Sequence, residues 1–381
     1  MSIQTLDLRF GGKLDSESSE IFNKLAFSLR SQFNEFIATI SNPHKNNLDW
    51  WVEGPACRNT FSSPLFHRFC CLHFIKNLIE NQHFSFSRIL VDSAAFKVVI
   101  ESMLSDLGVV GCRVVHKKPS IKRKLKNYLM VPMLIGMKIL QLIIAKRSGK
   151  PHLKDLKHNQ LILIDTYMFA GYTQNDRWYG LLWENISDVV KRQTYFVPTL
   201  VKTPISKMLG TYKELRNNIR NFLIKEDFLK LSDIIFAAQH QRRIKKINIQ
   251  SVRVLNYEIN NLIKEELVNN SDKLTVIESI LTHRFVKNLK DNGLKVRLAI
   301  DWFEGQANDK AWNYSFNSLY SKIKTIGYRE ECFPFYLCSF PLQIEREAKV
   351  LPDVMAVQGS GSISTVREFV PDLEVIVIPS F

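Results

Sequence analysis

Residues 296–310 read VRLAIDWFEGQANDK, and this stretch decides the fold class. Residues 296–303 form a mainly apolar run of strand length, which ends at a short polar loop. A helical pattern begins soon afterwards, around residues 308–310. A buried strand that leads directly into a helix is typical of a parallel sheet with helices on both faces. The stretch therefore predicts an α/β protein.

The same pattern recurs on both sides of this stretch. Residues 205–292 are predicted to be mainly helical, with Ser271 and Asp272 as a cap and Gly293 as a stop. We expect one α/β domain over residues 1–381, with a mostly parallel sheet and this helical insertion. Further strands are predicted at residues 88–93 (RILVDS), 109–116, 161–165 (LILID), 194–200, 335–340, 354–359 and 375–380.

The composition predicts an ordered protein with an anionic partner. The chain has 381 residues, 45% of them hydrophobic, which is ample for a large core and excludes wholesale disorder. Lys and Arg number 52 against 37 Asp and Glu, a net charge of +15. The six cysteines are scattered without CxxC spacing, which predicts buried thiols in a reducing compartment. Residues 1–20 contain no apolar core of signal-peptide length.

The positive charge is concentrated at residues 117–150. This segment contains ten Lys or Arg and no Asp or Glu, and it encloses the apolar run 128–145 (YLMVPMLIGMKILQLIIA). Pro132, Lys138 and Gln141 are costly at the middle of a bilayer, so we expect the segment to lie on an anionic membrane surface. A buried core helix and a true membrane span are the alternatives. Nucleic acid suits the charge but not the apolar run, so no nucleic-acid partner is expected.

The loop after residues 296–303 offers the first candidate site. Ligands of parallel sheets bind beyond the carboxyl ends of the strands. Glu304 would stand there as a carboxylate base, with Trp302, Gln306 and Lys310 as substrate contacts. Lys310 would lie in the first helical turn, where backbone N–H groups already favour anions. The alternative is that Glu304 only caps the helix and Lys310 is solvated.

Three further places have residue types that suit a sugar or a phosphate. Asp165 ends the strand at residues 161–165, and Asp176 with Arg177 precedes two aromatic residues. An Asp–Arg pair beside aromatic rings suits a sugar ring, and an ordinary turn with a local ion pair is the alternative. The other candidates are Gly359 and Ser360 in GSGS, whose alternative is a simple turn, and Arg58 and Asn59 in a loop that enters a helix.

Several kinds of site have no motif in this sequence. The histidines are dispersed and no pair has metal-ligand spacing, so no metal is predicted. There is no Walker-type loop and no GxSxG motif, which excludes P-loop NTPases and α/β-hydrolases as simple interpretations.

Three stretches resemble a known family. Residues 301–319 (DWFEGQANDKAWNYSFNSL), 326–362 (from IGYREEC to MAVQGSGS) and 374–381 (EVIVIPSF) are similar to bacterial surface-carbohydrate biosynthesis proteins of the GT-B glycosyltransferase type. Trp-x-Glu-x-Gln followed by Asp-Lys-Ala is the most specific part. LIDTYM, DRWYGL, YFVPTL and RNTFSSPLF also resemble this family, which builds O-antigen (lipopolysaccharide) and capsule.

The resemblance implies a transferase with two Rossmann-type domains. The present chain would be the N-terminal, acceptor-side domain, and the chain stops where a linker to a donor domain would begin. The implied partners are a nucleotide-sugar, which serves as co-substrate without a further cofactor, and a lipid-linked glycan at the inner face of the plasma membrane. Glu304 would be the base and Lys310 a phosphate or sugar contact. A non-catalytic, membrane-associated module of a polysaccharide assembly system is the alternative.

Overall fold

The structure is a computed structural model that describes residues 4–60, 63–81, 83–117, 121–149, 156–157, 159–269, 272–329 and 340–379, with only the backbone described for 121–128. The strand expected at residues 335–340 lies outside the described residues except for Phe340. Ser271, Cys332 and Cys338 also lie outside them.

A six-stranded sheet forms the larger half of the molecule. Its order is β11-β10-β9-β8-β4-β5, and every neighbouring pair is parallel. Five of its strands coincide with predicted ones, so the mostly parallel α/β fold is confirmed. The strands are β4 (Gln160–Met168), β5 (Thr194–Leu200), β8 (Lys295–Trp302), β9 (Lys324–Arg329), β10 (Val354–Gln358) and β11 (Glu374–Ile378).

Strand β9 has a weak sequence signal because Lys324, Thr325 and Gly327 interrupt its apolar residues. The glycine is required by packing. A Cβ atom at Gly327 would lie 2.8 Å from Cγ of Pro352 and 2.9 Å from Cβ of Phe303. Such distances are shorter than real Cβ contacts, so the close approach of the loops after β8 and before β10 demands glycine here.

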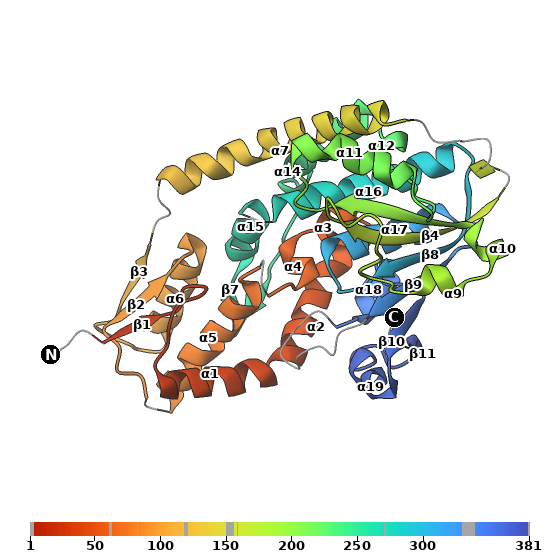
Figure 1. Cartoon of the computed structure of the whole chain (residues 1–381). Helices are drawn as coiled ribbons and strands as arrows, with labels where there is room; N and C mark the ends of the chain where they lie inside the picture. Colours follow the sequence, from red (N-terminus) through yellow and green to blue (C-terminus); the bar gives the residue numbers. More distant parts are fainter. Residues whose placement is uncertain are drawn as a thin grey trace.

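Helices cover both faces of this sheet, as Figure 1 shows. On one face, Leu161 and Leu163 of β4 pack against two long helices, α16 (Lys273–Asp291) and α17 (Ala307–Leu319). On the other, Ile162 and Ile164 pack against the loop after β4 and the short helix α9 (Leu182–Asn185), which α10 (Asp188–Lys191) follows. The alternation of β4 side chains thus places one apolar row in each core.

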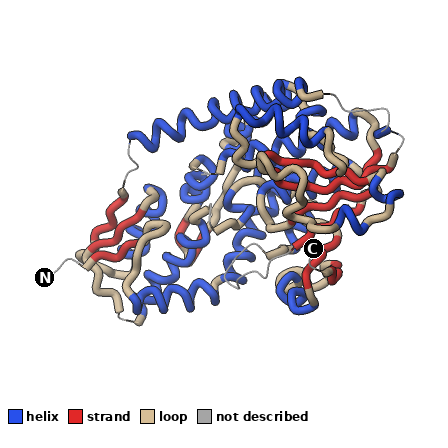
Figure 2. Tube along the Cα trace, viewed as in Figure 1, coloured by secondary structure: helices blue, strands red, loops and turns tan. Residues whose placement is uncertain are grey.

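A second, three-stranded parallel sheet lies at the opposite end of the molecule (Figures 1 and 2). Its order is β1-β2-β3, and it has a hydrophobic core of its own. The predicted strands at residues 88–93 and 109–116 belong to this sheet and are shorter than expected. The elements of this part are β1 (Thr5–Asp7), α1 (Ser16–Ser28), α2 (Arg30–Ser41), η1 (Asn42–His44), α3 (Leu48–Trp51), α4 (Gly54–Cys57), α5 (Leu65–Glu80), β2 (Arg88–Val91), α6 (Ala94–Asp106) and β3 (Arg113–His116).

The predicted helical insertion is mainly helical and separates β5 from β8. Asp272 caps α16 by accepting a hydrogen bond from the backbone N–H of Thr275, and Gly293 follows the helix with φ of +75°. Both signals were predicted. The insertion contains α11 (Ile205–Arg216), α12 (Lys225–Phe228), α13 (Leu231–Ala238), α14 (His240–Ile244), a hairpin of β6 (Arg253–Val254) and β7 (Tyr257–Glu258), α15 (Asn260–Val268) and α16.

The basic apolar segment forms one long helix, α7 (Ile121–Arg147), along an edge of the molecule (Figure 1). Leu134 and Leu142 pack into the core beside α16 and the six-stranded sheet. Residues 129–147 are long and apolar enough to cross a membrane, and 28% of that stretch is buried. Length and composition of this kind are also found in core helices of proteins outside membranes. The remaining elements are α18 (Gln343–Glu347), η2 (Ser360–Ser362) and α19 (Ile363–Val366).

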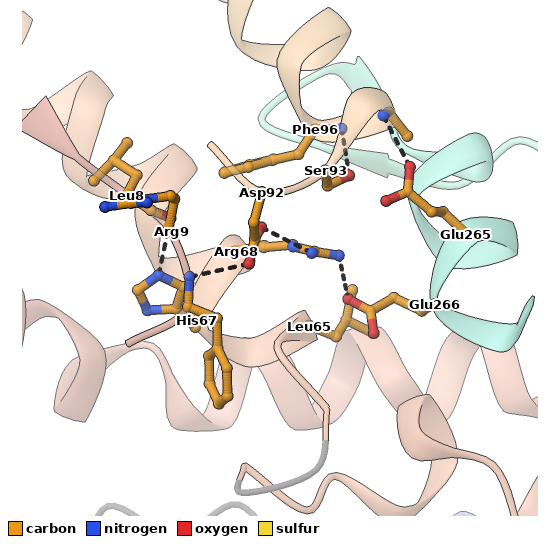
Figure 3. Close-up of polar contacts among 12 residues, drawn as sticks. Leu8, Arg9, Leu65, His67, Arg68, Asp92, Ser93, Phe96, Glu265 and Glu266 are labelled. Atoms are coloured by element: carbon orange, nitrogen blue, oxygen red, sulfur yellow. Dashed lines mark hydrogen bonds and ion pairs between the residues drawn. The ribbon is translucent and has the colours of Figure 1, made fainter. Parts of the chain in front are cut away.

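A buried ion cluster holds the smaller half together, and Figure 3 shows its contacts. Arg68 of α5 donates to Glu266 of α15 at 2.6 Å and to Asp92, just after β2, at 3.0 Å. Burial raises the pKa of Glu266 to about 7, although the guanidinium of Arg68 opposes the shift. Arg68 thus joins the helix, the strand end and the inserted α15.

We expect Arg68→Met to destabilise the fold. The change leaves Glu266 buried without its cation, and breaking a buried pair in this way costs about 3–5 kcal/mol. Arg88→Met is the matched control, because Arg88 is exposed on β2. Denaturant unfolding should show the large loss for the first variant only. Equal stability of the two variants would contradict the role of Arg68.

Candidate functional site

The six-stranded sheet contains a point where the direction of its chain connections reverses. Strand β4 is followed by β5 on one side, whereas the adjacent β8 is followed by β9 on the other. Ligands of open parallel sheets bind at such a point, in the crevice beyond the carboxyl ends of the two strands. The crevice is therefore expected beyond Met168 and Trp302, the ends of β4 and β8.

Two predicted strands bring a pair of aspartates together at this point. Ile164 of β4 pairs with Ile300 of β8, so Asp165 and Asp301 follow side by side on the face covered by α17. Asp309 of α17 approaches both of them. All three side chains are buried, with exposed fractions of 7%, 0% and 1% for Asp165, Asp301 and Asp309. Like charges this close oppose each other's ionisation.

The pKa values reflect this crowding. Burial raises the pKa of Asp165 to about 6, even though the ammonium group of Lys225 opposes the shift. Burial and then the carboxyl of Asp309 raise the pKa of Asp301 well above its ordinary value. Burial also raises the pKa of Asp309 to about 8, against two backbone N–H donors that favour its charged form. Burial and the neighbouring carboxyl groups thus favour the neutral form of Asp301.

These aspartates have structural partners. The carboxylate of Asp309 accepts hydrogen bonds from the backbone N–H groups of Glu304 at 2.8 Å and Gln306 at 2.9 Å. It thereby fixes the loop that enters α17. Asp301 accepts a hydrogen bond from the side-chain amide of Asn313 at 2.9 Å. The Oδ1 atoms of Asp301 and Asn313 are buried without a hydrogen-bond partner among the described residues.

The loop that Asp309 fixes presents alternate residues to the surface. Glu304, Gln306 and Asn308 are half-buried, whereas Gly305, Ala307 and Asp309 between them are buried. Glu304 accepts a hydrogen bond from the indole N–H of Trp302 at 3.1 Å, which holds its carboxylate in place. Glu304 thus lies just beyond the carboxyl end of β8, and we call the surface formed by Glu304, Gln306 and Asn308 the rim of the expected crevice. The role of Glu304 as a base stays a prediction.

Two other segments reach this rim. The Asn59 amide donates to the Gln306 side chain at 2.5 Å, so these two predicted residues meet. Both line a small pocket together with Gly54, Asp272 and Thr275. From β4, the half-buried Tyr167 places its hydroxyl 3.5 Å from the amide nitrogen of Asn308.

Three aromatic rings, those of Trp302, Trp178 and Tyr328, pack together next to this rim. Trp302 is itself 5% exposed, so it serves as packing for its neighbours more than as a surface for a ligand. Its ring centroid lies 4.9 Å from that of Trp178 and 5.0 Å from that of Tyr328. Trp178 is half-buried and donates from its indole N–H to the carbonyl of Tyr167 at 2.8 Å.

The structure places Lys310 and Arg58 inside the protein. Both ion-pair with Glu345, at 2.7 Å for the ammonium group and 2.8 Å for the guanidinium. Lys310 also donates to the carbonyl of Ala56 at 2.5 Å and stacks over Trp51 at 5.4 Å. Burial favours the neutral form of Glu345, but the two cations outweigh it and lower its pKa. A phosphate contact by either cation would require this pair to open.

Asp176 and Arg177 do not pair with each other. Asp176 binds the guanidinium of Arg220 at 2.9 Å and accepts from the backbone N–H of Trp178 at 3.0 Å and of Tyr179 at 2.9 Å. It therefore shapes a turn, the alternative given for this motif. Arg177 is exposed, with its guanidinium 5.7 Å from the ring centroids of Phe169 and Trp178. This side chain remains as an exposed cation beside the crevice.

Gly359 and Ser360 follow β10, at the same edge of the sheet but two strands away from β8. Gly359 has φ of +74°, a conformation that favours glycine, and a Cβ atom there would meet open space. Ser360 begins the short helix η2. The sheet order therefore places both residues at the edge where β8 ends, but on a strand that does not adjoin β8.

Sequence reasoning did not select Tyr167 and Asn308 as site residues, and it named Trp178 only as an aromatic residue beside Asp176 and Arg177. Tyr167 follows Asp165 at the alternating position of β4, so strand periodicity contained its signal. Asn308 continues the alternation of Glu304 and Gln306 along the loop. The place of Trp178 over the end of β4 depends on a loop fold that no local pattern encodes.

Comparison of the chain with protein-family models, curated proteins and solved structures finds no match. Within the described residues, no group of three or more His, Cys, Asp or Glu side chains has the geometry to hold a metal ion. The residues of the crevice themselves indicate which kind of ligand it suits. Its half-buried groups are a carboxylate, three amides, a phenol and an indole, a set that suits a ligand rich in hydroxyl groups.

We expect Asp301→Asn to reduce the pH dependence of stability. The unfolded chain loses the Asp301 proton near 3.8, whereas the folded protein keeps it to a much higher pH. In the range between, the unfolded state binds fewer protons, so the free energy of unfolding falls as the pH rises. Asparagine cannot ionise, so above that range the variant should be more stable than wild type by about 1 kcal/mol or more.

Denaturant unfolding at a series of pH values from about 4 to about 8 checks this expectation. Asp188→Asn is the control, because the Asp188 side chain is 88% exposed and its curve should run parallel to that of wild type. An Asp301→Asn curve with the wild-type slope would show that Asp301 ionises normally.

Proposed function

We propose that this chain is the acceptor-side part of a glycosyltransferase of surface-polysaccharide biosynthesis. The observation that carries the proposal is the position of Glu304, a half-buried carboxylate at the rim of the β4–β8 crevice. The same residue belongs to the stretch that most resembles GT-B glycosyltransferases. The proposed reaction moves a sugar from a nucleotide-sugar to a glycan, with a lipid-linked glycan as the expected acceptor.

In this reaction Glu304 acts as the general base. It removes the proton from an acceptor hydroxyl while the hydroxyl oxygen attacks the anomeric carbon of the donor sugar. The bond from that carbon to the nucleotide diphosphate breaks, and the diphosphate leaves with the electron pair. The hydrogen bond from Trp302 orients the carboxylate toward one position.

The charges around the crevice support an acceptor over a donor on this wall. Lys310 and Arg58 are both buried and paired with Glu345, so neither side chain reaches a diphosphate at this surface. The rim groups Asn59, Gln306 and Asn308 are amides, which bind neutral hydroxyls from either direction. Arg177 is the exposed cation closest in sequence to this aromatic wall.

A second candidate function is a non-catalytic, membrane-associated binding module of the same assembly system. The burial of Lys310 and Arg58 favours it, because it leaves this wall able to hold a glycan without holding a nucleotide-sugar. The two functions differ in whether Glu304 is needed for turnover.

A sugar-transfer assay of the protein separates the two functions. With membrane extract and a panel of nucleotide-sugars, Glu304→Gln should lower the rate by roughly 10²–10⁴-fold, the usual contribution of a general base. Glu347→Gln is the control, because Glu347 is exposed on α18 and should leave the rate unchanged. If Glu304→Gln transfers sugar at the wild-type rate, Glu304 is not the general base. If wild type transfers sugar from none of the donors, the binding module is favoured.

A further inference from the structure

Between residues 129 and 145, helix α7 turns its two long polar side chains, Lys138 and Gln141, inward and leaves a row of apolar side chains exposed. At 100° per residue, Leu134, Lys138, Gln141, Leu142 and Ala145 share one side of the helix. All five are buried, with exposed fractions between 0% and 8%. The opposite side is apolar and exposed to about half, and we call it the outer face. It consists of Leu129 (52%), Met133 (60%), Met137 (37%), Leu140 (37%) and Ile143 (43%).

The inner polar groups fix the rotation of the helix. Lys138 forms an ion pair with Glu278 of α16 and donates to Gln141 at 2.8 Å. Gln141 donates in turn to Glu226 of α12 at 2.8 Å and to the hydroxyl of Tyr212 on α11 at 2.9 Å. Turning the helix over would leave Glu278 and Glu226 buried without these partners, so the apolar residues are held outward.

The outer face has an unusual composition for an exposed surface. Lys138 is the only charged residue between positions 129 and 145, and it points inward. Pro132 and Gly136, both exposed, lie on the same side as the five apolar residues. The result is an uncharged apolar stripe of about 22 Å, the length of fifteen helical residues. Exposed apolar stripes of this kind mark interaction sites.

Cations stand at both ends of the stripe. Lys146 and Arg147 end the helix and are exposed. The sequence places Lys122, Arg123, Lys124 and Lys126 in the first two turns of the same helix. The helix contains no Asp or Glu between them. An apolar stripe with cations at its ends complements a lipid surface, in which acyl chains lie below a layer of anionic headgroups.

We propose that the outer face of α7 docks onto an anionic lipid surface, with the helix lying in the plane of the interface. Leu129, Met133, Met137, Leu140 and Ile143 enter the acyl region, and the terminal cations bind headgroups. A second copy of the chain suits this face less well. Five half-exposed side chains offer only a few hundred Å², against about 800 Å² per partner in a stable dimer. The proposal does not depend on the sugar-transfer reaction.

Vesicle flotation tests the proposal on the full chain. The probes are vesicles of phosphatidylcholine alone and vesicles with roughly one third phosphatidylglycerol. Wild type should float with the anionic vesicles, less with the neutral ones, and less in high salt. Met133→Glu/Leu140→Glu should reduce the bound fraction of the anionic sample by about tenfold or more, because it places charge in the apolar stripe.

The matched control is Val98→Glu/Val189→Glu, which adds the same charge at two apolar residues that are 64% and 59% exposed on α6 and α10. It should float like wild type. Met133→Gln/Leu140→Gln removes the apolar side chains without added charge and should also lose binding. Circular dichroism confirms that each variant is folded.

Three results would overturn the proposal. Wild type could fail to float with either kind of vesicle, or the control could lose as much binding as the outer-face variants. In the third result, wild type does not bind vesicles but is a dimer, and Met133→Glu/Leu140→Glu is a monomer. That result would assign the outer face to a second copy of the chain.

Discussion

The pairing of β4 with β8 is the constraint on which the rest of this structure depends. Between these neighbours the chain forms β5 on one side and then crosses a helical insertion of more than seventy residues, from α11 to α16, before it returns as β8. The return on the opposite side of β4 creates the reversal point of the sheet. It also sets Asp165 beside Asp301 and places α17, with Asp309, above them. The position of Glu304 follows from that geometry.

Buried ion pairs also determine how the elements of this structure pack together. Arg68, Glu345 and Lys138 are each almost completely buried, and each has a charged partner from an element distant in the sequence. Because an unpaired charge would be costly inside the protein, each pair specifies how two elements meet. The buried cations Arg58 and Lys310 pair with Glu345 and therefore do not line the surface of the crevice. Electrostatic stabilisation of the fold and ligand binding thus use different residues.

Local patterns were sufficient for much of the fold. Strand β5 has the predicted limits, and Asp272 and Gly293 mark the ends of α16 as expected, because caps and buried strands are encoded by adjacent residues. Glu304 was also placed correctly at the end of a parallel strand. The partners of Lys310 and Arg58 were not foreseen, since Glu345 is distant in sequence and comes near only after folding. The same limitation hid the inward turn of Lys138 and the division of the strands between two sheets.

Glycan binding between the ends of β4 and β8 can be tested by a crystal structure of the protein soaked with oligosaccharides of bacterial surface polysaccharides. We expect sugar density in contact with Glu304, Gln306 and Asn308, with a hydroxyl within hydrogen-bond distance of the Glu304 carboxylate. Sugar density only at another part of the molecule would show that the ends of β4 and β8 do not bind the glycan.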